Sequence, residues 1–181
     1  MNRGTAFRSV VMTALWAMLP AYLPNSVALV VGGGPPIDGG RFWRGARLLG
    51  DGKTWRGAIG GFLAGVLLAL GLNQVGTRSA GSLPVFPLRA ALSLPAGAML
   101  GDLAGSFLKR RIGRERGAPA PVLDQLGFVA GAFALTRLLA PGWFRSTFTA
   151  PVTVAALLLT PLLHVVTNAL AYVVGLKDVP W

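Results

Sequence analysis

The chain contains little charge and no cysteine. Asp, Glu, Lys and Arg together make up 13% of its 181 residues, about half the share usual in soluble domains, whereas 53% of the residues are hydrophobic. So few charged groups cannot cover the surface of a water-soluble globule, and the composition therefore predicts a membrane protein. A length of 181 residues suits one domain, which we place over residues 1–181.

These absences also exclude several kinds of site. Without cysteine there are no disulfides, zinc–thiolate sites or thiol nucleophiles, and a single histidine, His164, excludes a multi-histidine metal site. Acidic residues are scarce, with 6 Asp and Glu against 17 Lys and Arg, so the net charge is +11. This imbalance predicts an anionic partner, which would be nucleic acid, a membrane surface or a phosphorylated substrate.

Five long apolar stretches predict an all-α polytopic membrane protein of about five transmembrane helices. A helix of about 20 apolar residues crosses roughly 30 Å of hydrocarbon. The stretches cover residues 10–31, 57–76, 85–108, 122–140 and 150–176. With so much of the chain in lipid, a nucleic-acid partner is disfavoured, and a multi-pass protein of the cell membrane is expected.

Basic residues gather in two of the predicted loops. The first carries Arg41, Arg44, Arg47, Lys53 and Arg56, and the second carries Lys109, Arg110, Arg111, Arg114 and Arg116. Because loops rich in Lys and Arg stay in the cytoplasm, both are predicted to face it. Five spans then place the N-terminus outside and the C-terminus in the cytoplasm.

Glycines recur every four residues in three of the predicted spans. They are Gly57, Gly61 and Gly65, then Gly97, Gly101 and Gly105, and finally Gly127 and Gly131. Small residues at this spacing let membrane helices approach closely. We predict that they form packing seams and carry no chemistry.

Two carboxylates lie in or beside the predicted spans. Asp102 lies inside the third span and Asp124 begins the fourth. An ionisable side chain at such a depth is costly and marks a functional site with a partner. One interpretation pairs each carboxylate with an arginine of the neighbouring basic loop. The other makes both of them ligands of Mg²⁺, which prefers oxygen ligands and commonly bridges to substrate phosphates.

The third span carries a polar stripe. Asp102, Ser106 and Lys109 are separated by four and seven residues, so they share one face of a helix. The stripe favours phosphate handling. Alone, the basic run 109–111 would be typical of a segment that only anchors the helix.

The first basic loop is rich in glycine and ends in a segment, residues 50–57, that leads directly into a helix. Glycines let backbone N–H groups approach phosphate oxygens, and a helix N-terminus adds a favourable dipole. The spacing is not that of a P-loop, and a flexible loop is the competing interpretation. Asp38 and Asp51 in this loop are interpreted as solvated turn residues rather than ligands.

Three segments resemble motifs of the membrane CTP transferases, the superfamily that includes phosphatidate cytidylyltransferase. Residues 53–57, Lys-Thr-Trp-Arg-Gly, resemble its K-T-W-x-G motif, and residues 101–110 resemble its G-D-x-x-x-S-x-x-K-R signature. Residues 121–124, Pro-Val-Leu-Asp, resemble its closing proline–aspartate element. The bacterial form is longer and carries a glycine- and histidine-containing stretch there, whereas this chain reads Ala-Pro-Ala-Pro-Val-Leu-Asp-Gln over residues 118–125. That departure, with only about five spans, is similar to the short archaeal branch, the CDP-archaeol synthases.

The resemblance implies an Mg²⁺-dependent cytidylyltransferase of ether-lipid biosynthesis. Its partners would be CTP, the isoprenoid ether lipid 2,3-di-O-geranylgeranyl-glycerol-1-phosphate and the surrounding membrane lipids, and its products would be CDP-archaeol and pyrophosphate. The implied catalytic residues are Asp102, Asp124, Lys53 and Lys109, with the two aspartates as metal ligands. The implied CTP-binding residues are Lys53, Thr54, Ser106, Lys109, Arg110, Arg111 and Asn168.

Other interpretations stay open at this point. A phosphatidate cytidylyltransferase would act on a diacyl lipid, and a small proton- or cation-coupled transporter would use Asp102 and Asp124 as ion sites. A CDP-alcohol phosphatidyltransferase is disfavoured because its paired-aspartate pattern is missing. His164 and Asn168 share a helix face, which favours hydrogen bonding between helices, although Asn168 would also be placed to reach the cytosine or ribose.

Overall fold

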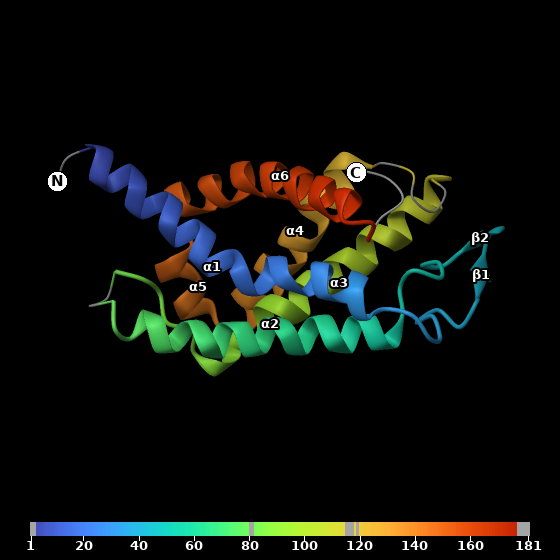
Figure 1. The fold of residues 1–181 in the computed structure, drawn as a ribbon, viewed down its shortest axis with the longest axis horizontal. Coiled ribbons are helices and arrows are strands. Elements are labelled where there is room, and N and C mark those ends of the chain that lie inside the picture. The colour runs from blue at the N-terminus through green and yellow to red at the C-terminus, as the bar shows by residue number, and fades with distance from the viewer. Residues whose placement is uncertain (1–2, 80–81, 115–117, 119, 177–181) are drawn as a thin grey trace.

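A computed structural model of the chain describes residues 3–79, 82–114, 118 and 120–176, so Arg116 and residues 177–181 lie outside the described part. The described residues form six helices and one short antiparallel hairpin (Figure 1). In chain order these are α1 (Arg3–Val31), β1 (Phe42–Trp43), β2 (Ala46–Arg47), α2 (Trp55–Gly76), α3 (Leu88–Arg111), α4 (Pro121–Leu139), α5 (Pro141–Thr147) and α6 (Ala150–Val173). This architecture fits the predicted all-α membrane protein, while the hairpin was not predicted.

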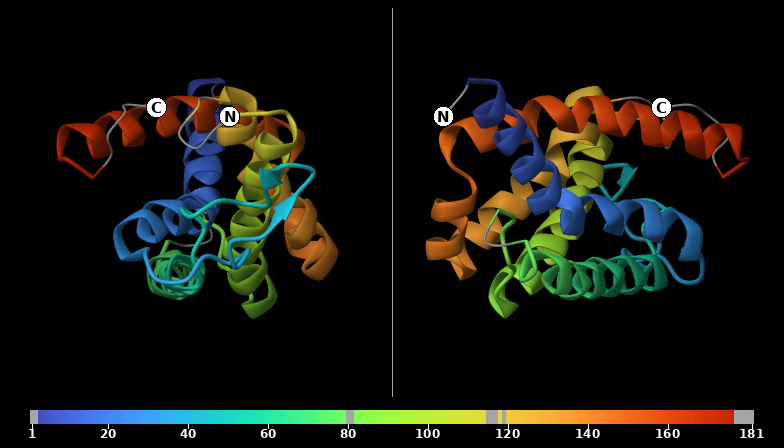
Figure 2. Two further views of the ribbon diagram at one scale, coloured as in Figure 1. Left: turned by 90° about the vertical axis from the view of Figure 1, so that its right-hand side faces the viewer. Right: turned by 60° about the vertical axis from the view of Figure 1, so that its left-hand side comes forward.

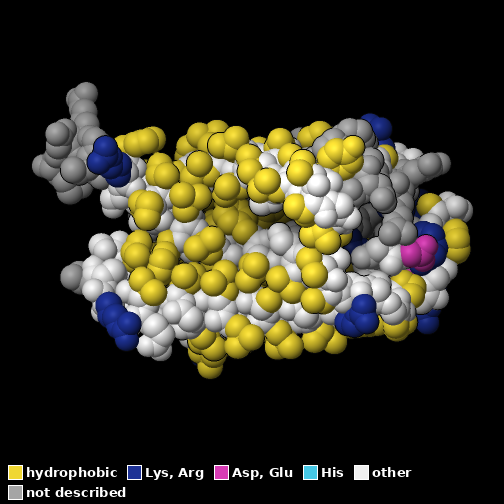
Figure 3. All heavy atoms as spheres, in the orientation of Figure 1, with side chains coloured by type: hydrophobic (Ala, Val, Ile, Leu, Met, Phe, Trp, Pro, Cys, Tyr) yellow, Lys and Arg dark blue, Asp and Glu magenta, His cyan; other side chains and the backbone are white. Residues whose placement is uncertain are grey.

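Four of these helices, α1, α2, α3 and α6, are long and apolar enough to cross a membrane. The 19-residue helix α4 occupies the fourth predicted stretch but is not among those four in the part of the chain that the structure describes. The number of five spans therefore stays a prediction. Space-filling atoms show a broad apolar surface between ends that carry Lys and Arg (Figure 3), as a multi-pass membrane protein requires.

The long helices alternate in direction along the long axis of the molecule. Figure 1 shows the end of α1, the start of α2, the end of α3 and the hairpin at one end, and the N-terminus at the other. Both basic segments thus lie at the same end of the bundle. α6 lies on the opposite side of the bundle from α2 (Figures 1 and 2).

The glycine seams predicted from the sequence are confirmed. A Cβ atom at Gly97 would lie 2.5 Å from the carbonyl oxygen of Gly131, and one at Gly101 would collide with that of Gly127, so α3 and α4 touch backbone to backbone. A Cβ atom at Gly65 would lie 2.7 Å from the carbonyl oxygen of Pro20, where α2 crosses α1. Close crossings of this kind are what small residues permit in membrane bundles.

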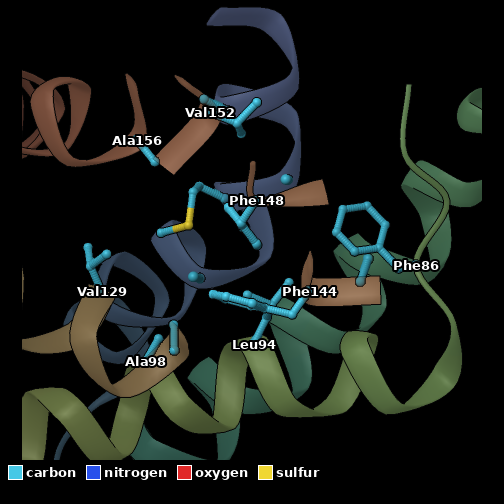
Figure 4. Close-up of a cluster of buried hydrophobic side chains, with 14 of the residues drawn as sticks. Phe86, Leu94, Ala98, Val129, Phe144, Phe148, Val152 and Ala156 are labelled. Atoms are coloured by element: carbon cyan, nitrogen blue, oxygen red, sulfur yellow. The ribbon is translucent and has the colours of Figure 1, made fainter. Parts of the chain in front are cut away.

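Apolar side chains from all six described helices contribute to one core, part of which Figure 4 shows. Met18 of α1, Leu94 of α3 and Val129 of α4 are fully or almost fully buried there. Phe144 of α5 and Phe148, the residue directly after α5, close the core at the end of the molecule remote from the hairpin. This packing holds α3 and α4 side by side, and these two helices carry both predicted catalytic aspartates.

Candidate active site

One cavity of about 790 Å³ gathers most of the predicted site residues. Its walls come from α1, α2, α3, α4, α6 and the end of the first basic loop. Among the residues that the structure describes, four charged side chains line it: Lys53, Asp102, Lys109 and Asp124. The two segments that the sequence singled out separately therefore contribute to a single site.

Lys53 enters the cavity from the loop that precedes α2. Its backbone carbonyl accepts a hydrogen bond of 2.8 Å from Ile37 N, and Thr54 caps α2 by accepting one of 3.2 Å from Gly57 N. A threonine at this position satisfies one of the unpaired N–H groups of the first helical turn. With its backbone fixed in this way, Lys53 Nζ lies 2.5 Å from Asp102 Oδ2 in the middle of α3.

A second ion pair joins the end of α3 to the start of α4. Lys109 Nζ lies 2.5 Å from Asp124 Oδ1, and Ala120 N donates a hydrogen bond of 2.9 Å to Asp124 Oδ2. Lys109 is in the last turn of α3 and Asp124 in the first turn of α4, where each charge is favoured by its helix dipole. The ion pair thus joins the two helices at the corner between them.

The two pairs give the cavity its chemistry. Sequence reasoning offered arginines as the structural partners of Asp102 and Asp124, whereas in the structure both partners are lysines. All four side chains are partly exposed to the cavity, with 21–30% of their surface accessible. An incoming anion can draw the ammonium groups away from the carboxylates, which then offer oxygen atoms to a cation.

The carboxylates present fit a magnesium site that a substrate completes. Among the residues that the structure describes, no group of three or more His, Cys, Asp or Glu side chains converges on one point. Asp102 and Asp124 nevertheless line the same cavity. Mg²⁺ is typically held by one or two carboxylates together with substrate phosphates and water, so two aspartates are a sufficient protein contribution.

Of the remaining residues predicted to bind CTP, some line the cavity and others do not. Thr54 and Asn168 line the cavity, whereas Ser106, Arg110 and Arg111 are not among its lining residues. Ser106 is buried in α3. Arg110 Nε donates a 3.4 Å hydrogen bond to Leu49 O, in the first basic loop. The predicted contacts of these three residues with CTP stay predictions.

Arg111 holds the hairpin rather than facing the cavity. Its guanidinium donates to the carbonyl oxygens of Trp43, Ala46 (3.0 Å) and Arg47 (2.7 Å). The guanidinium carbon also lies 5.1 Å from the ring centroid of Trp43 and 5.2 Å from that of Phe107, within cation–π range. These contacts attach the first basic loop to the end of α3.

Comparison with known proteins identifies the family. A profile of the CarS-like family, described as CDP-archaeol synthase, matches residues 7–181. The chain belongs to this family. A CDP-archaeol synthase of Halorubrum lacusprofundi is 57% identical over 177 residues, covering 96% of this chain and 98% of the relative. That of Haloarcula marismortui is 59% identical over 175 residues, covering 94% and 97%.

A solved structure agrees with the assignment to the CDP-archaeol synthase family. An intramembrane enzyme for archaeal membrane lipid biosynthesis superposes with a TM-score of 0.73 at 40% identity. The match covers 87% of this chain and 94% of that protein. This CDP-archaeol synthase family member is therefore a multi-pass membrane protein with the same fold.

In this family member, sequence reasoning was wrong about Asp38. It was interpreted as a solvated turn residue, but it is buried, at 6% exposure, and accepts hydrogen bonds from Arg47 and from three backbone amides. The Arg47 guanidinium, with those amides, holds the pKa of the Asp38 carboxyl well below its usual range, although burial acts in the opposite direction. Of these contacts, only the one to Gly40 N could have been predicted from the local sequence, because Asp commonly accepts a hydrogen bond from the backbone N–H two residues ahead in a turn.

Asp51 does behave as a solvated residue. Its side chain is 63% exposed and lies 2.7 Å from Arg47 Nη1.

His164 and Asn168 both line the cavity, and Asn168 Nδ2 lies 2.7 Å from His164 Nε2 along α6. This contact joins residues of one helix, and the predicted hydrogen bonding between helices stays a prediction.

Apolar side chains also line the cavity. Leu29 and Val30 come from α1, and Leu163 and Leu170 come from α6. One cavity therefore offers both charged and apolar side chains, which suits a molecule with a phosphate head and hydrocarbon chains. Sequence reasoning did not find this apolar lining, because its residues look like ordinary membrane-facing side chains.

Proposed function

We propose that the chain transfers the cytidylyl group of CTP to the phosphate of 2,3-di-O-geranylgeranyl-glycerol-1-phosphate, giving CDP-archaeol and pyrophosphate. The observation that carries this proposal is the joining of two Lys–Asp pairs and an apolar wall in one cavity of a CDP-archaeol synthase family member. Relatives named CDP-archaeol synthase that cover nearly the whole chain support it.

The reaction needs positioning and neutralisation of charge rather than a nucleophilic side chain. An oxygen of the lipid phosphate attacks the α-phosphorus of CTP and forms a new P–O bond. The bond from the α-phosphorus to the oxygen that bridges it to the β-phosphorus breaks, and pyrophosphate leaves with that oxygen and its electron pair. Lys53 and Lys109 would hold the triphosphate, because phosphoryl transfer depends mainly on placing and stabilising these charges.

Asp102 and Asp124 would hold Mg²⁺ against the phosphates. When bound, the metal neutralises charge on the attacking and leaving oxygens. An incoming triphosphate would draw Lys53 and Lys109 out of their ion pairs, so that their ammonium groups donate to phosphate oxygens. The same four side chains would thus serve the empty and the loaded site.

The apolar wall between α1 and α6 would receive the isoprenoid chains. Leu29, Leu163 and Leu170 line it, and contact between such apolar side chains and hydrocarbon is favoured because it removes apolar surface from water. Lys53 and Lys109 come from the loop before α2 and from the last turn of α3, which lie at the end of the bundle that carries both basic segments. The positive-inside tendency would therefore put the active site on the cytoplasmic side. CTP would then enter from the cytosol and the lipid from the membrane.

The alternatives are less favoured. A phosphatidate cytidylyltransferase would share the chemistry, but the similar relatives are named CDP-archaeol synthases. A cation-coupled transporter would use the same aspartates, but family membership points to an enzyme.

The test is a transfer assay with defined lipid acceptors. Purified protein is incubated with CTP labelled at the α-phosphate, Mg²⁺ and one acceptor: the geranylgeranyl ether phosphate, a diacyl phosphatidate or none. We expect labelled CDP-lipid and stoichiometric pyrophosphate with the ether lipid, and loss of both in Asp102→Asn. Equal turnover of the diacyl lipid would reject the ether-lipid assignment. No product with either lipid would reject the cytidylyltransferase.

A further inference from the structure

We propose that Asp38 is a positioning residue that acts on the reaction through Lys53, an inference that rests on the proposed function. Asp38 lies in the first basic loop, outside the cavity walls, and neither the family motifs nor the comparisons assign it a role. It is nevertheless the most heavily bonded carboxylate in the described part of the chain. The structure indicates what those bonds accomplish.

Both oxygens of Asp38 are committed to holding the loop. Oδ1 accepts from Gly40 N at 3.1 Å and Arg47 Nη2 at 2.8 Å. Oδ2 accepts from Leu49 N and Gly50 N at 3.0 Å each, and from Arg47 Nε at 3.2 Å. A carboxylate has about four lone-pair positions, and five donors occupy them. Asp38 therefore has no capacity left for a ligand, and its effect must pass through the residues that it holds.

The bonds lead directly to Lys53. Gly50, which Asp38 holds, accepts a hydrogen bond from Lys53 N at 3.2 Å. Ile37, the residue before Asp38, donates to Lys53 O at 2.8 Å. The turn from Gly50 to Lys53 is thus attached at both ends to the segment around Asp38. Gly50 has φ +99°, a conformation that other residues rarely adopt, so the turn has one defined shape.

The partners of Asp38 are all hydrogen-bond donors, so they require the ionised carboxylate, which only accepts. Replacing it with asparagine keeps the size but exchanges one oxygen for an NH₂ group. That group would face Arg47 Nε and the amides of Leu49 and Gly50 donor to donor or, in the flipped orientation, Arg47 Nη2 and the amide of Gly40. The segment that holds the Gly50–Lys53 turn therefore loses bonds in either orientation, and we expect the turn to shift. A shift of the order of 1 Å in a positioning group can cost about a hundredfold in rate. Lys53 Nζ would then lose its position 2.5 Å from Asp102.

A double-mutant cycle tests whether Asp38 acts through Lys53. We measure kcat/KM for CTP in the wild type, Asp38→Asn, Lys53→Met and the double variant. Asp38→Asn is expected to lower kcat/KM by about tenfold in the wild type and by less than about twofold in Lys53→Met, because coupled residues are not additive. Asp51→Asn is the matched control: it removes the other, exposed carboxylate on Arg47 and should be near wild type in both backgrounds. An equal loss from Asp38→Asn in both backgrounds, or no loss at all, overturns the proposal.

A cross-linking readout makes the test independent of activity. Because the chain has no cysteine, Lys53→Cys with Asp102→Cys introduces a single thiol pair that a short bifunctional thiol reagent can join. Adding Asp38→Asn should reduce cross-linking severalfold, whereas adding Asp51→Asn should not. Unchanged cross-linking overturns the positioning role even where Lys53→Met has too little activity to measure. If the wild type transfers no cytidylyl group, the proposed function fails, while the cross-link still decides the position of Lys53.

A second variant covers the case in which Asp38→Asn does not accumulate as folded protein. Arg47→Gln removes the two guanidinium bonds and leaves the three amide bonds to Asp38 in place. It should lower kcat/KM and cross-linking in the same direction by a smaller factor, and again only where Lys53 is present. A loss of kcat/KM that persists in Lys53→Met contradicts the proposal.

Discussion

Lys53 and Asp102 are 49 residues apart in the sequence, and their side chains meet at 2.5 Å inside the cavity. Lys109 and Asp124, 15 residues apart, form a second pair of the same kind. The first basic loop and the α3–α4 corner therefore build one site rather than two. Both acids and both lysines of this site were singled out by the sequence.

Most of the basic side chains with described contacts at this end of the molecule bind either the backbone or the cavity. The guanidinium groups of Arg56, Arg110 and Arg111 donate to backbone carbonyl oxygens, whereas Arg47 is paired with carboxylates of its own loop. The two lysines instead reach carboxylates in the cavity. A guanidinium presents five donors in a rigid fork and suits several carbonyls at once, whereas an ammonium is a compact charge on a flexible stem. These three arginines thus hold the backbone around the site, whereas the two lysines line the cavity itself.

Removing either aspartate should abolish turnover. Asp102→Asn and Asp124→Asn each retain the volume of the side chain but remove an anionic ligand for Mg²⁺, so kcat should fall by roughly a hundredfold or more. EDTA should likewise stop the wild-type enzyme, and added Mg²⁺ should restore it. Steady-state assays of folded protein check this, with Asp51→Asn as the exposed control. Substantial activity in one variant would remove that aspartate from the metal site.

Lys109→Gln and Arg111→Gln should fail in different ways. Loss of a charge-assisted hydrogen bond to the triphosphate should lower kcat/KM about 10- to 100-fold in Lys109→Gln. Arg111→Gln should instead lower the unfolding temperature, because its guanidinium holds three hairpin carbonyls. Kinetics and thermal unfolding in detergent, run on both variants, separate the two effects. A larger loss of kcat/KM in Arg111→Gln would return Arg111 to the CTP site.

A single methyl group in the α3–α4 seam should destabilise the fold. In Gly97→Ala the new Cβ would lie 2.5 Å from Gly131 O and 2.7 Å from Ala132 Cα, which are backbone atoms that cannot turn aside. Overpacking of this kind costs about 1–3 kcal/mol. Gly71→Ala in α2 is the matched control, since nothing lies within 4 Å of its Cβ position. Thermal unfolding should show a loss for Gly97→Ala and none for Gly71→Ala; equal behaviour would mean that α3 and α4 are not in backbone contact.

Cysteine labelling should determine the orientation. Asp51→Cys and Arg114→Cys lie in the two basic segments, and Ser82→Cys lies in the α2–α3 connection. In sealed cells, a membrane-impermeant maleimide should label only Ser82→Cys; after permeabilisation it should label all three. The opposite pattern would reverse the orientation. Labelling of Asp51→Cys and Arg114→Cys from different sides would contradict the shared site.

The stability conferred by Asp38 should depend on pH in one direction. Because its pKa is lower in the folded chain than in the unfolded chain, the contribution is complete above the unfolded value of about 3.9 and is lost as the pH falls below it. The difference in unfolding temperature between the wild type and Asp38→Asn should be constant from about pH 8 to 5 and shrink below about pH 4. A difference that grows on acidification would contradict the assignment of an ionised, hydrogen-bonded Asp38.

The sequence by itself determined the membrane class and the approximate extents of the long helices, and it singled out the four charged residues that the structure gathers in the cavity. Apolar runs of about 20 residues leave little choice of structure, since only a helix satisfies its backbone hydrogen bonds within lipid. Asp102 and Asp124 stood out because charge is costly there. The glycine seams followed from their spacing of four, which is a local property of a helix.

Only the tertiary structure decided how these parts are assembled. The choice of lysine over arginine as the partner of each aspartate depends on which loop folds over which helix end. The burial of Asp38 depends on Arg47, Leu49 and Gly50, nine to twelve residues away, and no periodicity marks an irregular loop of this kind. Arg111 is drawn from the cavity to the hairpin by carbonyls more than 60 residues distant in sequence. Side-chain partners at such separations are set by the path of the backbone through space, which the local pattern of residues does not encode.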